Sequence, residues 1–504
     1  MMKKLLLAIL CLALCLGALC GCSDIEIGSK PFTGFSGSGG TVIGPAPSSS
    51  GGTDSPKGAQ IVLEGDTARF TGGGVSVSGS TVTIASPGSY TVSGTLHDGC
   101  IVVDTGEVKG DVTLTLNGAD ITCLGGPAIH VVQAKNFDLV LESGTDNRLV
   151  SGSPEASPAE KQDGAALFSE DDLDIYGGGT LEVFGYLNNG ITCKDDLDIK
   201  EGTITVTALY NGVKGSESVE IYGGSLTITA GHDGLKATSA KKEGKGFVDI
   251  SGGTTLITAG GDGVSAETTL TVSGGTLRVT TTGERDEGSC KALKAKTLLN
   301  ISGGEVELDS ADHALHSALD MNLSGGTVKL VSRAGKGLSA HGEILLSGCT
   351  LDVTAADDGI EAEERVTVSG GVTVVYAKGN GVKAGSKSGA GAGVFHISGG
   401  SVYVNAYGDP FEAKGGATIS SGTFVGVGSP KTPKGFSGTG SQPWLMFSFA
   451  GAEGSKAEIW SAENELVDVI EARCGYTCAI YSSSALDSGT YTLECGTLKA
   501  SAVC

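Results

Sequence analysis

This chain of 504 residues has few aromatic residues, few basic residues and no apolar residues at the spacing of a helix. Only 5% of the residues are Phe, Trp or Tyr, whereas 83 are glycine, a balance that fits a corner-rich repeat better than several globular cores. Lys and Arg number 34 against 57 Asp and Glu, and the formal charge is −23, so nucleic acid and anionic membrane surfaces are poor partners. No stretch carries the apolar spacing of an amphipathic helix, which excludes helical and leucine-rich repeats.

A Gly-Gly turn recurs at a nearly fixed interval along the middle of the chain. The residues that follow the glycines lie 22 or 23 positions apart in most steps and 29 apart in three steps. A unit of this length with recurring seven-residue insertions predicts a solenoid, in which each unit adds one coil. The residues after the glycines are Thr180, Thr203, Ser225, Thr254, Thr276, Glu305, Thr327, Thr350, Val372, Ser401 and Thr423.

Within each unit, apolar residues alternate with polar ones. Val219 and Ile221 flank Glu220, and Leu226 and Ile228 follow with the same alternation. Period two, β-branched residues and interruptions by GG or DG predict three short strands per unit. We therefore predict an all-β fold, a right-handed parallel β-helix with about 22 residues per coil, whose adjacent strands lie about 4.8 Å apart.

The N-terminus resembles a bacterial lipoprotein signal. Two lysines precede the apolar run Leu5–Leu19, which is too short for a comfortable transmembrane helix. The run leads into a Cys-Gly-Cys sequence whose last residue, Cys22, is the expected lipidation site; ordinary signal-peptidase cleavage is the alternative. We predict that residues 1–22 are a signal peptide. The mature chain is then expected at the cell surface, held on the outer face of the bacterial cytoplasmic membrane by this lipid anchor only.

Changes in composition divide the remaining chain into four parts. Residues 23–58 are rich in Gly, Ser and Pro and predict a flexible tether. Residues 59–165 are β-rich but less regular, as expected for N-terminal coils and a cap over the open end of the core. Regular coils are predicted over 166–428. Residues 429–504 contain both tryptophans and predict a small C-terminal β module or cap.

Nine cysteines follow Cys22. Cys193 takes the position of small inward residues and is expected to be a buried thiol. Cys290 and Cys349 fall in other columns of the repeat, so stacked disulfides between coils are not expected. The last four cysteines crowd into the final 31 residues, where an extracellular location favours a disulfide. These four are Cys474, Cys478, Cys495 and Cys504.

Alignment of the coils on their glycine turns places acidic side chains in one outward column. Each acid stands between two inward apolar residues, and in-register stacking costs each neighbouring pair roughly 1 kcal/mol even in water. Just upstream, a DDL motif repeats on successive coils without an evident column of lysines between them. Clustered carboxylates of this kind predict Ca²⁺, which accepts six to eight oxygens in loose geometry; a solvated acidic face is the alternative. The expected metal ligands are Asp171, Asp172, Asp174, Asp195, Asp196, Asp198 and Glu220.

A second column opens each corner with Asn or Asp, usually followed by Gly, and lysines recur three residues further on. Such lysines are suited to gripping uronate carboxylates, whereas neutralisation of acidic neighbours is the alternative. Asn and Asp at these positions also suit the backbone of tight corners. The candidate ligand-binding residues are Asp233, Asp262, Lys214, Lys236 and Lys294.

Several segments together resemble a known family. They include TVTIASPGSYTVSGTLHDG, GAALFSEDDLDIYGGGTLEV and NNGITCKDDLDIKEGTITVTA, and the similarity covers residues 59–425. The pattern is similar to that of the bacterial lipoprotein-type carbohydrate-binding family built on a parallel β-helix, whose clostridial relatives bind polygalacturonic acid and carry calcium. The resemblance implies the same for this chain, and only the DDL corners match closely enough to carry over as metal candidates.

Three functions compete at this point. The first is a non-catalytic binder of acidic polysaccharide in which Ca²⁺ bridges two negatively charged partners. The second is a pectate-lyase-like enzyme, in which calcium acidifies the proton beside the carboxylate and a lysine removes it; Asp233 with Lys236, or Asp262 with Lys294, fits that scheme. The third is a structural or ice-binding solenoid, which charged residues such as Glu305 disfavour because they interrupt the rows of threonine.

Overall fold

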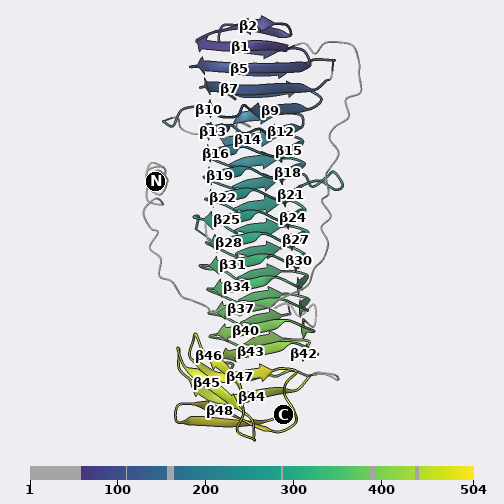
Figure 1. The fold of residues 1–504 in the computed structure, drawn as a ribbon, viewed down its shortest axis with the longest axis vertical. Helices are drawn as coiled ribbons and strands as arrows, with labels where there is room; N and C mark the ends of the chain where they lie inside the picture. Colours follow the sequence, from purple (N-terminus) through teal and green to yellow (C-terminus); the bar gives the residue numbers. More distant parts are fainter. Residues whose placement is uncertain (1–57, 109, 156–163, 285–287, 386–392, 438–441) are drawn as a thin grey trace. The chain divides into compact units, whose positions relative to one another are not determined.

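The computed structural model describes residues 58–504 apart from 109, 156–163, 285–287, 386–392 and 438–441 (Figure 1). The described residues form strands and turns without any helix, which confirms the all-β fold class. It follows that none of them forms a helix of the length and hydropathy needed to cross a membrane. The predicted signal peptide with Cys22, and the predicted tether up to residue 57, lie outside the described residues.

The N-terminal strands begin with two antiparallel pairs, β1 with β2 and β3 with β4, before parallel pairing takes over. These strands are β1 (Gly58–Gly65), β2 (Ala68–Gly72), β3 (Val75–Ser78), β4 (Thr81–Ile84), β5 (Gly88–Leu96), β6 (Cys100–Asp104), β7 (Val112–Cys123), β8 (Ile129–Gln133), β9 (Phe137–Leu141), β10 (Asp146–Ser151) and β11 (Ala165–Ser169).

From residue 173 onward the strands recur in threes and stack into three columns of parallel strands, which confirms a β-helix-like solenoid. The first column contains β12 (Leu173–Tyr176), β15 (Asp196–Ile199), β18 (Ser218–Ile221), β21 (Phe247–Ile250), β24 (Thr269–Val272), β27 (Leu298–Ile301), β30 (Asp320–Leu323), β33 (Glu343–Leu346), β36 (Arg365–Val368), β39 (Val394–Ile397) and β42 (Ala417–Ile419).

The second column contains β13 (Thr180–Gly185), β16 (Thr203–Ala208), β19 (Ser225–Ala230), β22 (Thr254–Ala259), β25 (Thr276–Thr281), β28 (Glu305–Ser310), β31 (Thr327–Ser332), β34 (Thr350–Ala355), β37 (Val372–Ala377), β40 (Ser401–Ala406) and β43 (Thr423–Gly428). The third column contains β14 (Asn189–Cys193), β17 (Val213–Gly215), β20 (Leu235–Ala237), β23 (Val264–Ala266), β26 (Leu293–Ala295), β29 (Leu315–Ser317), β32 (Leu338–Ala340), β35 (Ile360–Ala362), β38 (Val382–Ala384) and β41 (Phe411–Ala413).

The register turns the sequence repeat into spatial neighbours. Ile204 pairs with Leu226, and Leu226 pairs with Thr255 in the following coil. Leu226, Ile228 and Ile250 are at most 1% exposed, as the alternating pattern predicts, and they belong to one continuous hydrophobic core. Cys193 is fully buried, which confirms the expected inward thiol.

The Gly-Gly turns are required by the close stacking of consecutive coils. Gly253 has a φ of 70°, in the left-handed region that favours glycine. A Cβ placed there would lie 2.6 Å from the Gly224 carbonyl oxygen of the preceding coil. Any side chain at this position would therefore push the two coils apart.

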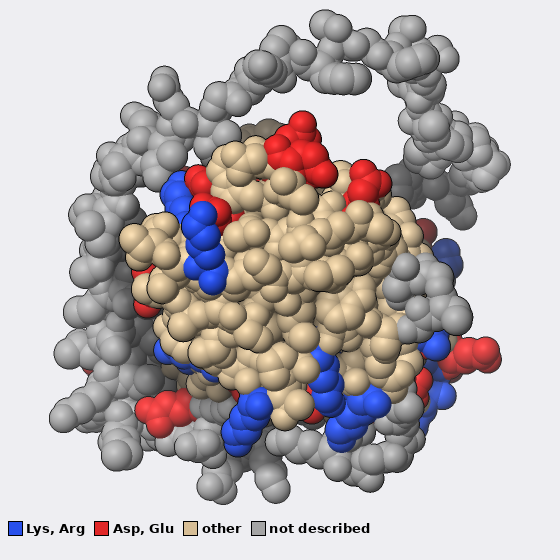
Figure 2. All heavy atoms as spheres, turned by 90° about the horizontal axis from the view of Figure 1, so that it is seen from below, with Lys and Arg blue, Asp and Glu red and all other residues tan. Residues whose placement is uncertain are grey.

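The last strands leave the parallel pattern. β47 (Tyr476–Ser482) pairs antiparallel with β43 and with β44 (Trp444–Gly451). β45 (Lys456–Trp460), β46 (Leu466–Glu471), β48 (Thr490–Cys495) and β49 (Leu498–Val503) form a four-stranded antiparallel sheet over a second hydrophobic core. Figure 2 shows this end, where the visible charged side chains lie mainly around a largely uncharged surface.

Candidate functional site

Five carboxylates stack in register along the first column and its N-terminal extension, and we call this set the acid ladder. Each member pairs with the next across adjacent parallel strands. Glu220 illustrates why the set points outward, because its neighbours Val219 and Ile221 are buried on either side. The acid ladder consists of Asp138, Asp174, Asp198, Glu220 and Asp249.

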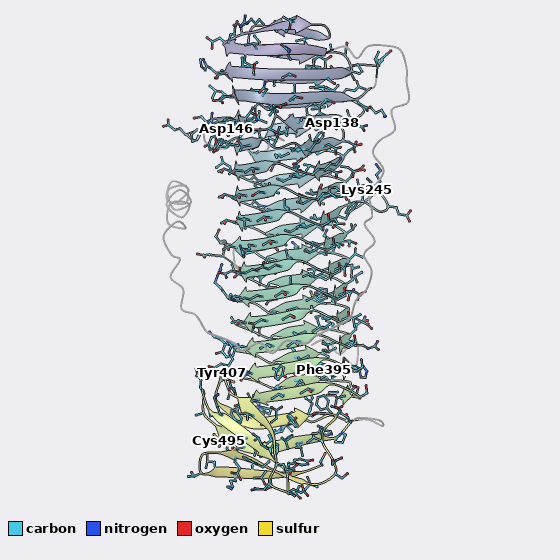
Figure 3. All side chains as sticks on the ribbon, in the orientation of Figure 1. Asp138, Asp146, Lys245, Phe395, Tyr407 and Cys495 are labelled. Carbon is cyan, nitrogen blue, oxygen red and sulfur yellow. The ribbon has the colours of Figure 1, made fainter. Side chains whose placement is uncertain are left out.

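The glycine-turn repeat places four of these acids in one column, whereas it leaves out Asp138. This residue lies on β9, in a coil that precedes the regular Gly-Gly repeat. Its local signal is an Asp between two buried apolar residues, Phe137 and Leu139, the same pattern that surrounds Asp174. Figure 3 labels Asp138 near the N-terminal end of the acid ladder.

Burial and mutual repulsion raise the pKa values of several ladder carboxyls. Burial, together with Asp174 and Glu220 on either side, raises the pKa of Asp198 to about 6. Burial and Asp174 also raise the pKa of Asp138, and burial and Glu220 raise that of Asp249. Accumulated negative charge on this face is therefore unfavourable near neutral pH, and a cation that binds there relieves it.

One lysine neutralises part of the acid ladder. Lys200 Nζ lies 2.5 Å from Asp174 Oδ2 and 3.6 Å from Asp198 Oδ2. Further along, Glu220 and Asp249 form no ion pair with any basic residue in the described part of the chain. The Tyr222 hydroxyl donates a hydrogen bond to Glu220 Oε2 at 2.7 Å, and Asp249 Oδ1 is buried without a hydrogen-bond partner among the described residues.

The N-terminal half of the acid ladder borders an open depression of about 470 Å³. Its lining residues are Asp138, Asp174, Tyr176, Lys200 and Glu201. Tyr222, which is 48% exposed, lies two coils further on at the position equivalent to Tyr176. The face thus combines carboxylate acceptors, one ammonium donor and aromatic rings, the groups that contact sugar hydroxyls and the apolar faces of sugar rings.

The DDL corners carry carboxylates that already accept backbone hydrogen bonds. Asp171 Oδ2 accepts a hydrogen bond from the Ala134 backbone nitrogen at 2.8 Å. Asp172 Oδ1 accepts one from the Asp196 backbone nitrogen at 3.3 Å, while burial raises the pKa of Asp172. These two acids therefore help to fix the stacking of their corners.

Among the described residues, no column of lysines separates the DDL corners, but a lysine from an insertion outside the repeat reaches them. Lys245, on the insertion between β20 and β21 that Figure 3 labels, places Nζ 2.5 Å from Asp196 Oδ2 and 3.3 Å from Glu217 Oε2. Lys242 Nζ lies 2.7 Å from Glu217 Oε1. Burial acts to raise the pKa of Glu217, but the hydrogen bonds from the two lysines outweigh it and lower the pKa. Burial and Glu217 raise the pKa of the remaining corner acid, Asp195.

The corner aspartates Asp233 and Asp262 are each only 2% exposed. Asp233 Oδ1 accepts a hydrogen bond from the Asp262 backbone nitrogen, and Asp262 Oδ1 accepts one from the Lys291 backbone nitrogen, both at 2.9 Å. Each carboxylate thus connects its coil to the next by a hydrogen bond. This arrangement agrees with the alternative that Asp at these positions stabilises the backbone of the corner. Their burial leaves almost no surface for contact with a ligand.

Two lysines of the third column form ion pairs with these aspartates. Lys236 Nζ lies 2.7 Å from Asp233 Oδ2, and Lys294 Nζ lies 2.8 Å from Asp262 Oδ2. Burial acts to raise the pKa of Asp233, but His232 and Lys236 outweigh it and hold the pKa at about 2. Lys214 pairs in register with Lys236 on the next strand. The pairs proposed for lyase chemistry do come together, as ion pairs in which the aspartate is buried and the lysine is partly exposed.

Residues 78–335 and 329–433 match the family model described as carbohydrate-binding domain-containing protein. These matches cover more than half of the chain. The chain belongs to this family. The matched residues of this carbohydrate-binding domain-containing protein include the whole acid ladder and end before the C-terminal four-stranded sheet.

A relative from Acetivibrio thermocellus, also named carbohydrate-binding domain-containing protein, is 37% identical over 153 residues. The aligned region is 30% of this chain and 53% of that relative, so this chain matches about half the relative's length. A solved structure, the gadolinium derivative of a polysaccharide lyase-like protein from C. thermocellum, is 35% identical. It aligns with 49% of this chain and 100% of its own, with a TM-score of 0.44.

Proposed function

We propose that this carbohydrate-binding domain-containing protein is a non-catalytic, cell-surface binder of acidic, pectin-like polysaccharide such as polygalacturonate, and that Ca²⁺ joins the two. The observation that carries the proposal is the acid ladder, in which like charges repeat on adjacent strands and only one lysine intervenes among the described residues. With a formal charge of −23, the chain repels a polyanion, so binding requires a cation between them.

The donor set fits a shared calcium ion better than an enclosed one. Among the described residues, no three His, Cys, Asp or Glu side chains are arranged to hold a metal. Ca²⁺ takes six to eight oxygens, and neighbouring ladder carboxylates supply only part of that number. Uronate carboxylates and water complete the shell in this proposal, so the ion binds weakly to the protein alone and more firmly when the polysaccharide is present.

Glu220 and Asp249 are the ladder members that best fit such an ion. They stand opposite each other without an ion-paired lysine or arginine in the described chain, and Asp249 Oδ1 is buried without a hydrogen-bond partner. Asp174 and Asp198 share Lys200, so a uronate carboxylate can contact that ammonium directly at this step. The DDL corners Asp171, Asp172, Asp195 and Asp196 stay candidates of lower rank, because backbone hydrogen bonds or Lys245 already occupy oxygens of three of them.

The aromatic residues provide apolar contacts to the sugar rings, which charged groups do not provide. Tyr176 lines the depression beside Asp174, and Tyr222 lies beside Glu220. A pyranose ring has apolar C–H faces that pack on aromatic rings, while its hydroxyls donate to carboxylates. A polysaccharide that runs along the acid ladder therefore meets both kinds of group at successive coils.

We further propose that Cys22 carries the lipid that holds the protein on the outer face of the cytoplasmic membrane. Support for this comes from the sequence, in which an apolar run of signal-peptide length ends at a Cys-Gly-Cys motif. A surface location would bring the acid ladder into contact with extracellular polysaccharide.

The test is a titration of polygalacturonate into the protein by isothermal calorimetry, once with CaCl₂ and once with EDTA. Binding is expected in calcium only. The double variant Asp198→Asn with Glu220→Gln should weaken binding in calcium by about tenfold or more, which corresponds to about 1.4 kcal/mol.

The matched control is Glu305→Gln with Glu307→Gln on β28, which removes the same charge from an exposed site that pairs with Arg278. This control should bind like the wild type. Equal binding in EDTA, or an equal loss in both double variants, contradicts the calcium-bridge proposal. Accumulation of unsaturated sugar product during the titration supports the pectate-lyase alternative instead.

A further inference from the structure

Cys100 and Cys123 lie side by side near the N-terminal end of the solenoid. Cys100 opens β6 and Cys123 closes β7. Two hydrogen bonds bracket the pair: the Gly99 backbone nitrogen donates to the Thr122 carbonyl oxygen at 2.8 Å, and the Leu124 backbone nitrogen donates to Asp98 Oδ1 at 3.0 Å. The backbone around both cysteines is thus fixed, and it places Cys100 next to Cys123 on the adjacent coil.

The pair is more accessible than the cysteines in the core of the coils. Cys193 and Cys349 are at most 1% exposed in the core, whereas Cys100 and Cys123 are both half-buried. An oxidant in solution can therefore reach this pair without opening the coils. No disulfide is formed among the described cysteines.

We propose that Cys100 and Cys123 are a modification site that a small-molecule disulfide converts into a disulfide between two adjacent coils. In the first step the Cys100 thiolate attacks one sulfur of oxidised glutathione, whose S–S bond breaks and releases one glutathione thiolate. In the second step Cys123 loses its proton to solvent and attacks the Cys100 sulfur, which releases the second glutathione. Two protein thiols are oxidised and one glutathione disulfide is reduced to two thiols.

The contact between the thiols assigns the two roles. The hydrogen bond from Cys123 lowers the pKa of Cys100 to about 6, whereas the same contact raises the pKa of Cys123. Cys100 is therefore the attacking thiolate near neutral pH, and Cys123 is the resolving thiol. Cys123 can attack the newly formed mixed disulfide because the backbone hydrogen bonds hold it next to Cys100.

The bond would reinforce the end of the solenoid where parallel stacking begins. β6 belongs to the sheet that continues into the third column, whereas β7 belongs to the sheet that contains the first and second columns. A covalent link between them joins the two sheets at a corner and closes a short loop, which restricts the unfolded chain. Fraying of the terminal coils then requires either reduction or unfolding beyond this point.

The test uses the full-length chain, first reduced and then incubated with oxidised glutathione at pH 7. Digestion without reductant and mass spectrometry should yield one cross-linked peptide pair that contains Cys100 and Cys123. The oxidised wild type should melt at a higher temperature than the reduced wild type. Cys123→Ala should instead retain glutathione on Cys100 and show no rise in melting temperature on oxidation.

Cys100→Ala is the matched control: Cys123 then has no neighbouring thiol, so oxidation should give no cross-linked peptide and no rise in melting temperature. The proposal is overturned if both wild-type thiols react with iodoacetamide after oxidation, if glutathione persists on wild-type Cys100, or if either cysteine pairs with a different one. Both single variants remove a half-buried side chain of similar size. A wild-type comparison with and without reductant covers the case in which a variant does not fold.

Discussion

Glu220 on β18 and Asp249 on β21 stand directly opposite each other, and Asp249 Oδ1 is buried without a hydrogen-bond partner among the described residues. Tyr222 donates to one oxygen of Glu220, but no described lysine or arginine forms an ion pair with either acid. The register of the sheet holds these two carboxylates close together although they repel each other. A cation bound between them is therefore stabilising.

Asp249→Asn tests this relationship without a polysaccharide. In EDTA the substitution should raise stability by about 1 kcal/mol, because it removes one of two neighbouring like charges. It should also reduce the rise in melting temperature that calcium produces in the wild type. Differential scanning calorimetry with EDTA and with CaCl₂ measures both effects. Glu307→Gln, whose parent residue pairs with Arg278, is the control; the interpretation fails if Asp249→Asn destabilises the fold and keeps the full calcium response.

The raised pKa of Asp198 predicts a pH dependence. A carboxyl with a pKa of about 6 in the folded protein and about 4 in the unfolded chain favours the folded state when protonated. Its contribution is complete below about pH 4 and is lost as the pH rises through about 6. Denaturant unfolding in EDTA across this window should show that loss in the wild type and less of it in Asp198→Asn. Identical pH profiles for the two proteins contradict the prediction.

Ile228 tests the inward register of the coils. Ile228→Asp removes a fully buried side chain and places an unpaired charge in the core, so it should cost at least about 4 kcal/mol. Loss of several neighbouring coils is expected, because each coil is stabilised by the next. Circular dichroism during thermal unfolding gives the measurement. Thr227→Asp, one residue earlier on the outward side of β19, should be nearly neutral; similar melting of both variants contradicts the register.

The corner aspartate Asp262 tests the distinction between structure and binding. Asp262→Asn leaves Lys294, whose side chain is 28% exposed, without its charged partner and should cost about 2 kcal/mol. The affinity for polygalacturonate should not change, because Asp262 is buried. The double variant Asp262→Asn with Lys294→Met should recover part of the stability. A stable Asp262→Asn protein with weakened sugar binding shows instead that this residue contacts the ligand.

Cys22 tests the proposed location. Cys22→Ala should abolish metabolic labelling by fatty acid and release the protein into the medium, because the thiol is the proposed acceptor of the lipid. Cys20→Ala, two residues earlier, is the control and should keep both properties. Membrane association of Cys22→Ala at the wild-type level shows that another segment is the anchor.

The sequence by itself determined the all-β solenoid and much of its outward face. Period-two alternation predicted the inward position of Ile228, and the repeat placed Asp174, Asp198 and Glu220 in one column. It succeeded because a parallel solenoid converts a fixed spacing along the chain into a fixed neighbour in space. The corner position of Asp233 followed from the same regularity and from the turn preference of Asp, whereas its burial is known only from the structure.

Only the tertiary structure decided which residues of the regular coils are contacted by the irregular segments. Lys245 lies on an insertion between two strands. The repeat spacing shows where this insertion interrupts the coils, but it does not show which carboxylate the Lys245 side chain contacts. Asp138 and the contact between Cys100 and Cys123 belong to coils without the Gly-Gly spacing, so no alignment of repeats brings them together. In these places adjacency depends on how corners and loops fold back across the coils, and periodicity carries no information about that.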